Sequence, residues 1–186
     1  LRNPDDFDQW CFSIDSALDS PENPVASSDV APEMVGASDL DNYGTWQADD
    51  DYGPVWYPDD MTVGWAPYRY GQWVWISPWG WTWVDDAPWG FAPFHYGRWL
   101  YARNRWGWVP GPSHVRPVYA PALVAFFGAG TGGPVGWCPL APREVYVPPY
   151  RASRRYFTNV NVTNVADMNR AAVANDYDNR AARNIG

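Results

Sequence analysis

Tryptophan alternates with other residues over residues 70–84, and this is the clearest pattern in the chain. In the string YGQWVWISPWGWTWV, indoles occupy every second position on both sides of a central Ser-Pro. Successive side chains of a β-strand point to opposite faces, so the spacing predicts a two-stranded hairpin with five indoles on one face. These indoles belong to Trp73, Trp75, Trp79, Trp81 and Trp83.

The same unit occurs three times. The pattern Tyr-Gly-x-Trp begins at Tyr43, Tyr70 and Tyr96, and in each case a second aromatic-Gly pair follows. The third copy alternates in the same way around a turn at residues 102–105, which is a length typical of hairpins. The first copy carries QADDD where the others have strand residues, and we expect it to be irregular. Repetition at this period indicates an array of similar supersecondary units.

A second motif accompanies the first. It reads VGWAP from Val63, WGFAP from Trp89 and VGWCP from Val135. Twelve of the fourteen tryptophans lie between residues 43 and 108. A lone hairpin is unstable in water, and soluble monomers rarely expose such a large apolar patch. We therefore expect about two-thirds of these rings to form a core shared by stacked hairpins.

The remaining segments give weaker signals. Residues 1–20 place a proline and acidic residues before an apolar stripe, which predicts a short helix. Residues 21–41 have no period and are expected to be disordered or draped over the surface. PALVAFFG is expected to be a buried strand, EVYVPPY an edge strand and YFTNVNVTNVA, at residues 156–166, a strand with one polar face.

The predicted fold is mainly β, with tandem aromatic-rich hairpin repeats, a short N-terminal helix and long irregular Pro/Gly-rich segments. We divide the chain into an acidic arm at 1–42, a repeat domain at 43–165 and an Ala/Asn/Arg-rich tail at 166–186 that is either a weak helix or disordered.

Charge is distributed unevenly along the chain. Residues 1–60 hold 15 acidic residues and one Arg, whereas the rest carries 12 Arg and 6 acidic residues. The net charge of −8 argues against a nucleic-acid partner. The acidic arm either keeps an aromatic protein soluble or lies on a basic surface, within one molecule or between molecules. Arg is the sole cation, which suits stacking on indoles, although genomic base composition produces the same bias.

The two cysteines, Cys11 and Cys138, fit no metal-binding spacing. In an oxidising compartment a disulfide between them would tie the arm to the Pro-rich segment; the alternative is two buried thiols. The sequence contains no apolar run long enough to cross a membrane.

Candidate catalytic residues are few. Asp85-Asp86 resembles a glycosidase carboxylate pair, with Glu144 further along, but DDAPWG is better explained as a turn between hairpins. His95 and His114 lack metal-ligand spacing. GAGTGG is not followed by the Lys-Ser/Thr of a phosphate loop. We expect no enzyme, no metal and no cofactor. Asn161-Val162-Thr163 matches the N-glycosylation acceptor triplet, which is common by chance.

Aromatic and arginine side chains left over from the core are the expected contact surface. The candidates are Tyr68, Arg69, Tyr70, Phe94, Tyr96, Arg98, Tyr101, Arg103 and Arg105. Such a surface suits a protein partner, which is either another copy of the chain or a larger complex. It also suits a glycan, because rings stack on sugars.

Taken together, DLDNYGTW, VGWAPYRYGQWVWISPWGWTWVDDAPWGFAPFHYGRWLY, RPVYAPALVAF and GWCPLAPREVYVPPYR resemble a Trp/Tyr/Pro-rich family of bacterial proteins of unknown function. The resemblance covers about residues 38–165. It implies a protein that is secreted, periplasmic or at the cell surface, and it carries no catalytic residue across. We expect a non-catalytic structural or assembly protein of the envelope, as a filament or an accessory subunit; the alternative is a glycan or cell-wall-binding module.

Overall fold

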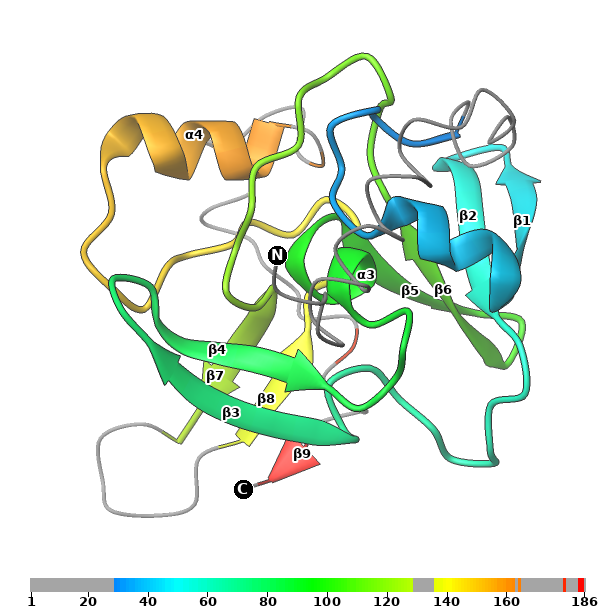
Figure 1. Ribbon diagram of the computed structural model, residues 1–186, viewed down its shortest axis with the longest axis horizontal. Helices are drawn as coiled ribbons and strands as arrows, with labels where there is room; N and C mark the ends of the chain where they lie inside the picture. The colour runs from blue at the N-terminus through cyan, green and yellow to red at the C-terminus, as the bar shows by residue number, and fades with distance from the viewer. Residues whose placement is uncertain (1–28, 129–135, 163, 165–178, 180–183, 186) are drawn as a thin grey trace, which may run out of the picture.

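The computed structural model describes residues 29–128, 136–162, 164, 179 and 184–185 (Figure 1). The described residues form three small antiparallel sheets and three short helical segments, which confirms the mainly β class. The helix expected at residues 1–20 lies outside this range.

The largest sheet combines the first and third sequence repeats. Its four strands run in the order β1-β2-β6-β5, with β1 at Gly44–Asp49, β2 at Gly53–Pro58, β5 at Arg98–Ala102 and β6 at Arg105–Val109. The second repeat forms a separate two-stranded sheet of β3 (Gly71–Ile76) and β4 (Gly80–Asp85). The third sheet has the order β7-β8-β9, with β7 at Val124–Phe127, β8 at Gly136–Pro139 and β9 at Asn184–Ile185.

The helical segments among the described residues are short. They are the 3-10 helix η1 (Ala37–Asn42), α3 (Phe91–His95) and α4 (Arg154–Val162). In Figure 1, α3 lies between the four-stranded sheet and the β3–β4 hairpin, and α4 lies apart from both. The chain therefore folds its repeats around a common interior instead of stacking them in a line.

Each Tyr-Gly-x-Trp motif starts a hairpin, and its Trp lies opposite a Trp on the second strand. The cross-strand pairs are Trp46 with Trp56, Trp73 with Trp83, and Trp99 with Trp108. The motif glycine lies beneath the ring of the second Trp. A Cβ added at Gly97 would come within 2.6 Å of Trp108 Nε1, and one at Gly71 within 2.7 Å of Trp83 Cζ2. The repeat is therefore a packing unit in which glycine makes room for an indole.

The first repeat is a regular hairpin, so the expectation of irregularity was wrong. Gln47 and Ala48 pair with Val55 and Pro54 in the β1–β2 ladder. The acidic run supplies the turn instead of breaking the strand, because Asp49 Oδ1 accepts the backbone N–H of Asp51 at 3.0 Å and that of Tyr52 at 3.2 Å.

The third hairpin has a tighter turn than the four residues expected. Ala102 pairs with Arg105, which leaves Arg103 and Asn104 as a two-residue loop with φ of 51° and 63°. Two consecutive positive φ values are typical of the type I′ turn that matches strand twist.

The second sequence motif does not recur as structure. Its copy at residues 63–67 is a loop, its copy at residues 89–93 leads into α3, and Gly136–Pro139 of the last copy forms β8.

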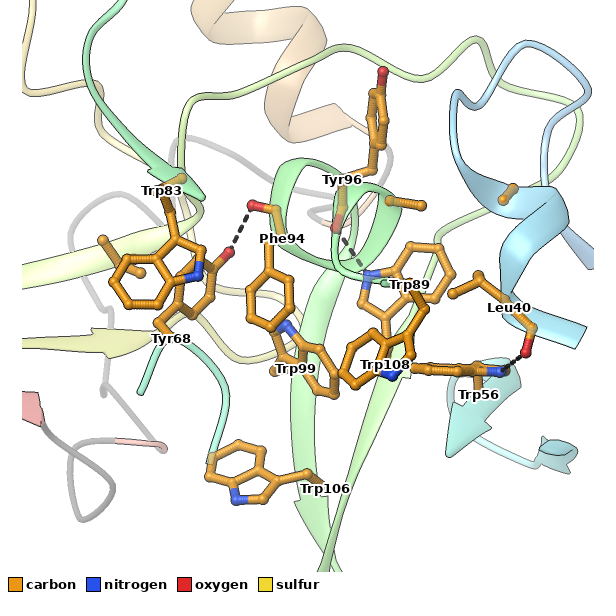
Figure 2. Packing of buried hydrophobic residues seen from close by; sticks show 14 of the residues in the cluster. Leu40, Trp56, Tyr68, Trp83, Trp89, Phe94, Tyr96, Trp99, Trp106 and Trp108 are labelled. Carbon is orange, nitrogen blue, oxygen red and sulfur yellow. Dashed lines mark hydrogen bonds between the residues drawn. The ribbon is translucent and has the colours of Figure 1, made fainter. Parts of the chain in front are cut away.

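Indoles fill the interior, as the pattern predicted. Of the thirteen described tryptophans, seven are buried, four are partly buried, and Trp75 and Trp81 are exposed. The rings meet mainly edge to face, as Trp56 does with Trp89 at 5.0 Å between ring centroids. Figure 2 shows how their N–H groups are satisfied, with Trp56 donating to Leu40 O at 3.0 Å and Trp108 to Tyr96 O at 2.9 Å. These buried indoles are therefore tolerated because main-chain carbonyls accept hydrogen bonds from their N–H groups.

Part of the segment assigned to the acidic arm belongs to this core. Val30, Met34, Ala37 and Leu40 are buried in the same cluster as the indoles. Residues 30–40 are therefore not a chain draped over the surface.

The C-terminal half differs most from expectation. PALVAFFG does contain a strand, β7, but the segment EVYVPPY has no strand and instead buries Glu144, Val145 and Tyr146. Residues 156–162 are part of helix α4, not a strand. The alternating Val and Asn residues do not define a sheet face, because Tyr156, Val160 and Asn161 share one helical face that packs on the core. Within the tail, Asn184–Ile185 adds a strand to β8.

Candidate binding cleft

A cleft of about 670 Å³ opens between the loop that follows β2 and the β5–β6 hairpin. Its volume lies within the range of about 300–1,000 Å³ that is usual for ligand sites. Its lining consists of Pro58, Met61, Thr62, Val63, Gly64, Trp65, Ala66, Arg69, Tyr101, Asn104, Arg105, Trp106 and Asn179.

Three rings supply the aromatic part of the cleft. Trp65 is fixed from behind, because its ring meets Trp99 at 5.6 Å and Trp89 at 6.0 Å between centroids. Tyr101 and Trp106 are cross-strand neighbours on β5 and β6, with centroids 5.0 Å apart. Trp106 lies apart from the central rings in Figure 2, toward the far end of the hairpin. The rings are therefore held by the core while part of their surface faces the cleft.

Two arginines give the cleft positive charge. Arg69 Nη1 donates to Gly64 O at 2.5 Å, which ties the cation to the cleft loop. Arg105 Nη2 donates to Gln47 Oε1 at 2.6 Å, and its guanidinium lies 3.7 Å from the centre of the Tyr57 ring. Arg103 is exposed at the tip of the same hairpin. The cleft thus combines aromatic rings with two arginine side chains that hydrogen bonds hold in place. This arrangement suits anionic or ring-shaped ligands.

The nine candidate surface residues divide into two groups. Arg69, Tyr70, Tyr101, Arg103 and Arg105 are exposed, and three of them line the cleft. The other four are buried and form no surface: Tyr68, Phe94, Tyr96 and Arg98. The expectation was wrong for these four because tertiary packing encloses them: Tyr68, Phe94 and Tyr96 belong to the indole-rich core, and Arg98 is bonded to distant segments. Sequence reasoning missed Trp65 and Trp106 because it assigned the indoles to the core as a class.

Arg98 is 1% exposed and acts as a buried cross-link. Its Nε donates to Glu144 O at 3.1 Å, Nη1 to Gly97 O at 2.8 Å and Nη2 to Asn161 Oδ1 at 3.0 Å. Burial lowers the pKa of the guanidinium to about 10, and the nearby Tyr68 and Glu144 oppose the shift. The cation stays protonated at neutral pH and joins β5 to two distant segments.

Asn161 completes this network. Its Oδ1 also accepts the N–H of Tyr146 at 2.7 Å, and its Nδ2 donates to Tyr146 O at 2.9 Å and to Phe157 O at 3.0 Å. The amide is fully enclosed, at 0% exposure. The side chain of Asn161 is therefore not accessible for glycosylation in the folded chain.

The carboxylate pair at Asp85-Asp86 forms a turn, as expected. Asp85 Oδ2 accepts Trp83 Nε1 at 2.9 Å, and Oδ1 accepts the N–H of Ala87 at 3.0 Å. Burial raises the pKa of Asp85 to about 6 despite these bonds. Burial also lowers the pKa of His95 to about 4; its Nδ1 lies 2.8 Å from Ala120 O. Both groups have structural roles, and their contributions to folding stability change in opposite directions with pH.

This opposition gives a pH-dependent prediction. The folded state holds the Asp85 proton more tightly than the unfolded chain does, so this group's stabilisation is lost as pH rises from about 4 to about 6. His95 binds its proton less tightly when folded, so its contribution is lost as pH falls from about 6.5 to about 4. Each effect amounts to about 3 kcal/mol.

Urea unfolding between about pH 4 and pH 7 separates the two effects. Relative to the wild type, we expect Asp85→Asn to lose stability on acidification and His95→Asn to gain it. Two variants with slopes of the same sign would contradict this assignment.

Among the described residues, no three His, Cys, Asp or Glu side chains form a group able to hold a metal ion. No described helix has the length and apolar character needed to span a membrane. Cys138 is fully buried, and Cys11 lies outside the described residues, so the disulfide stays a prediction.

Comparison with known proteins gives one match. The chain matches no curated protein and no solved structure. Residues 37–144 match the model described as Family of unknown function (DUF6600), from η1 through all three hairpins to Glu144. Since the match spans more than half of the 186 residues, the chain belongs to this family of unknown function, DUF6600.

Proposed function

We propose that this protein is a non-catalytic structural or assembly protein of the bacterial envelope or exterior, acting through aromatic and arginine contacts. One observation carries the proposal: the cleft gathers Trp65, Tyr101 and Trp106 with Arg69 and Arg105 on one surface. Among the described carboxylates, Asp49, Asp85 and Glu144 accept hydrogen bonds from backbone N–H groups.

Charge complementarity indicates the partner. Residues 1–60 hold 15 of the chain's 21 acidic residues, whereas the cleft presents Arg69 and Arg105. An acidic segment of a neighbouring copy is therefore a suitable occupant, with its carboxylates at the arginines and its apolar side chains on the rings. A head-to-tail contact of this kind yields a filament if it does not close. An accessory subunit of a larger envelope complex would use the same surface.

Exterior localisation is part of this proposal. It is supported by the resemblance of the aromatic string to secreted and envelope-associated bacterial proteins. In an oxidising compartment we expect Cys11 to pair with Cys138, which would tie the acidic arm to β8.

A glycan is the second candidate for the cleft. The half-exposed ring of Tyr101, 51% accessible beside Trp106, offers a stacking face to a sugar. Under this alternative, soluble cell-wall polysaccharide would quench tryptophan fluorescence in the wild type and much less in Tyr101→Ala.

Light scattering after size exclusion, at ionic strengths from about 0.05 to about 1 M, tests the assembly role. We expect assemblies at low salt that dissociate as salt screens the arginines. The variant Arg69→Ser/Arg105→Ser should remain small at every salt concentration.

The matched control is Arg116→Ser/Arg151→Ser, which removes two exposed arginines that do not line the cleft. Both variants carry the same net charge, so equal loss of assembly in the two would refute the role of the cleft.

A further inference from the structure

The β3 strand forms an open edge of the two-stranded sheet. Within the described part of the chain, β3 pairs with β4 alone. Figure 1 shows β4 between β3 and α3, with β3 on the outer side. The opposite edge of the hairpin is held, because the N–H of Trp83 donates to Pro121 O at 3.0 Å.

That bond fixes which groups of β3 point outward. Since the N–H of Trp83 points away from β3, Trp83 and Trp73 form a non-hydrogen-bonded pair, and so do Trp81 and Trp75 two residues on. The backbone N–H and C=O groups of Trp73 and Trp75 therefore point away from β4. Among the described residues, none of these groups has a hydrogen-bond partner.

The edge lacks the usual protection against strand addition. Residues Gly71–Ile76 contain no charged residue and no proline. Trp75 and Trp81 stand 65% and 56% exposed, with their rings 5.5 Å apart, at the same end of the hairpin as the exposed Ile76. By contrast, the outer strand β1 ends in Asp49, followed by two further aspartates, and like charges oppose its pairing with itself.

We propose that β3 is a self-association site, where it pairs antiparallel with β3 of a second copy in a register centred on Val74. In this register Trp73 of each copy exchanges both hydrogen bonds with Trp75 of the other, which satisfies all four outward groups in each strand. Because β3 is uncharged and can pair with itself about Val74, the same strand of a second copy is a suitable partner for this edge. The exposed Trp75 rings are then covered on the same face of a four-stranded sheet.

The expected dimer is weak. Taking about 200 Å² for a whole indole, Trp75 and Trp81 leave on the order of 240 Å² exposed per copy. Even with the backbone edge, two copies bury less than the roughly 1,200 Å² of a stable interface. We therefore expect reversible dimers that depend on protein concentration. This contact is independent of the proposed cleft contact, since it involves no charge and persists when salt screens the arginines.

Disulfide trapping of the full chain at about 1 M salt tests the register, because the cleft contact is screened there. The α-carbons of Val74 in the two copies lie about 4.5 Å apart in the proposed pairing. Under mild oxidation, Val74→Cys should yield at least about ten-fold more covalent dimer than Ile76→Cys, whose counterpart is Gln72 of the other copy. Equal yields, or none from Val74→Cys, would overturn the proposal.

Hydrogen exchange on the unaltered protein provides a test that needs no variant. The amides of Trp73 and Trp75 should become protected as protein concentration rises, while those of Val74 and Ile76 stay protected throughout by β4. Exchange at Trp73 and Trp75 that does not change with concentration would refute self-association at this edge. If dimers form only at low salt, the cleft mediates assembly and β3 does not.

Discussion

Replacing Asn161 with Ala is expected to destabilise the protein by about 3–5 kcal/mol, because it leaves one nitrogen of the buried Arg98 cation and buried main-chain groups of Tyr146 without their partner. The substitution removes four hydrogen bonds, which reach Arg98 Nη2, the N–H and C=O of Tyr146, and Phe157 O. The groups of Arg98 and Tyr146 do not regain water, since these two residues are each 1% exposed. Urea unfolding followed by tryptophan fluorescence measures the loss.

The control is Asn159→Ala, two residues away on the same helix, where the side chain is exposed. It changes the same atoms in the same helix, and we expect it to alter the free energy of unfolding by less than about 0.5 kcal/mol. Similar values for the two variants would show that the Arg98 network contributes little. Arg98→Lys adds a second check, because one ammonium cannot reach three acceptors held around a planar guanidinium.

Gly97→Ala is expected to be at least as damaging, with a loss of about 3–5 kcal/mol. The new Cβ would clash with Val109 O and come within 2.6 Å of Trp108 Nε1. Both neighbours are fixed: Val109 pairs with Arg98, and Trp108 is fully buried with its N–H bonded to Tyr96 O. The backbone at Gly97 also has φ of +68°, which L-residues with a side chain rarely adopt.

Gly53→Ala separates the steric effect from the backbone effect. Gly53 has φ of +75°, but an added Cβ would meet nothing within 4 Å. We expect this variant to lose only the roughly 1–2 kcal/mol associated with a left-handed conformation. The difference between the two variants in the midpoint of urea unfolding therefore measures how much stability depends on the space that Gly97 leaves for the Trp108 ring. If both variants lose the same amount of folding stability, the packing role assigned to the motif glycine is wrong.

The candidate site was predicted in part. The sequence singled out Arg69, Tyr101 and Arg105, which the fold brings into one cleft although they come from two segments. It could not place Trp65 beside them, because that indole belongs to a motif that takes a different conformation in each of its three copies. It also could not separate Tyr70, which is exposed, from Tyr68, which is fully buried and donates to Phe94 O at 2.9 Å.

The sequence by itself determined the hairpins and their indole faces. Alternation with a period of two is a local property, and the Tyr-Gly-x-Trp motif carries both the strand and the glycine that accommodates the opposite ring. Tertiary structure alone decided how the hairpins associate. Sheet order depends on contacts between distant segments, so β2 pairs with β6 while β3 and β4 remain a separate sheet with an open edge. Tertiary structure also decided that residues 156–162 are helical. Asn161 Oδ1 accepts hydrogen bonds from Arg98 and Tyr146, and these contacts favour the helix although Val and Asn alternate as they would in a strand.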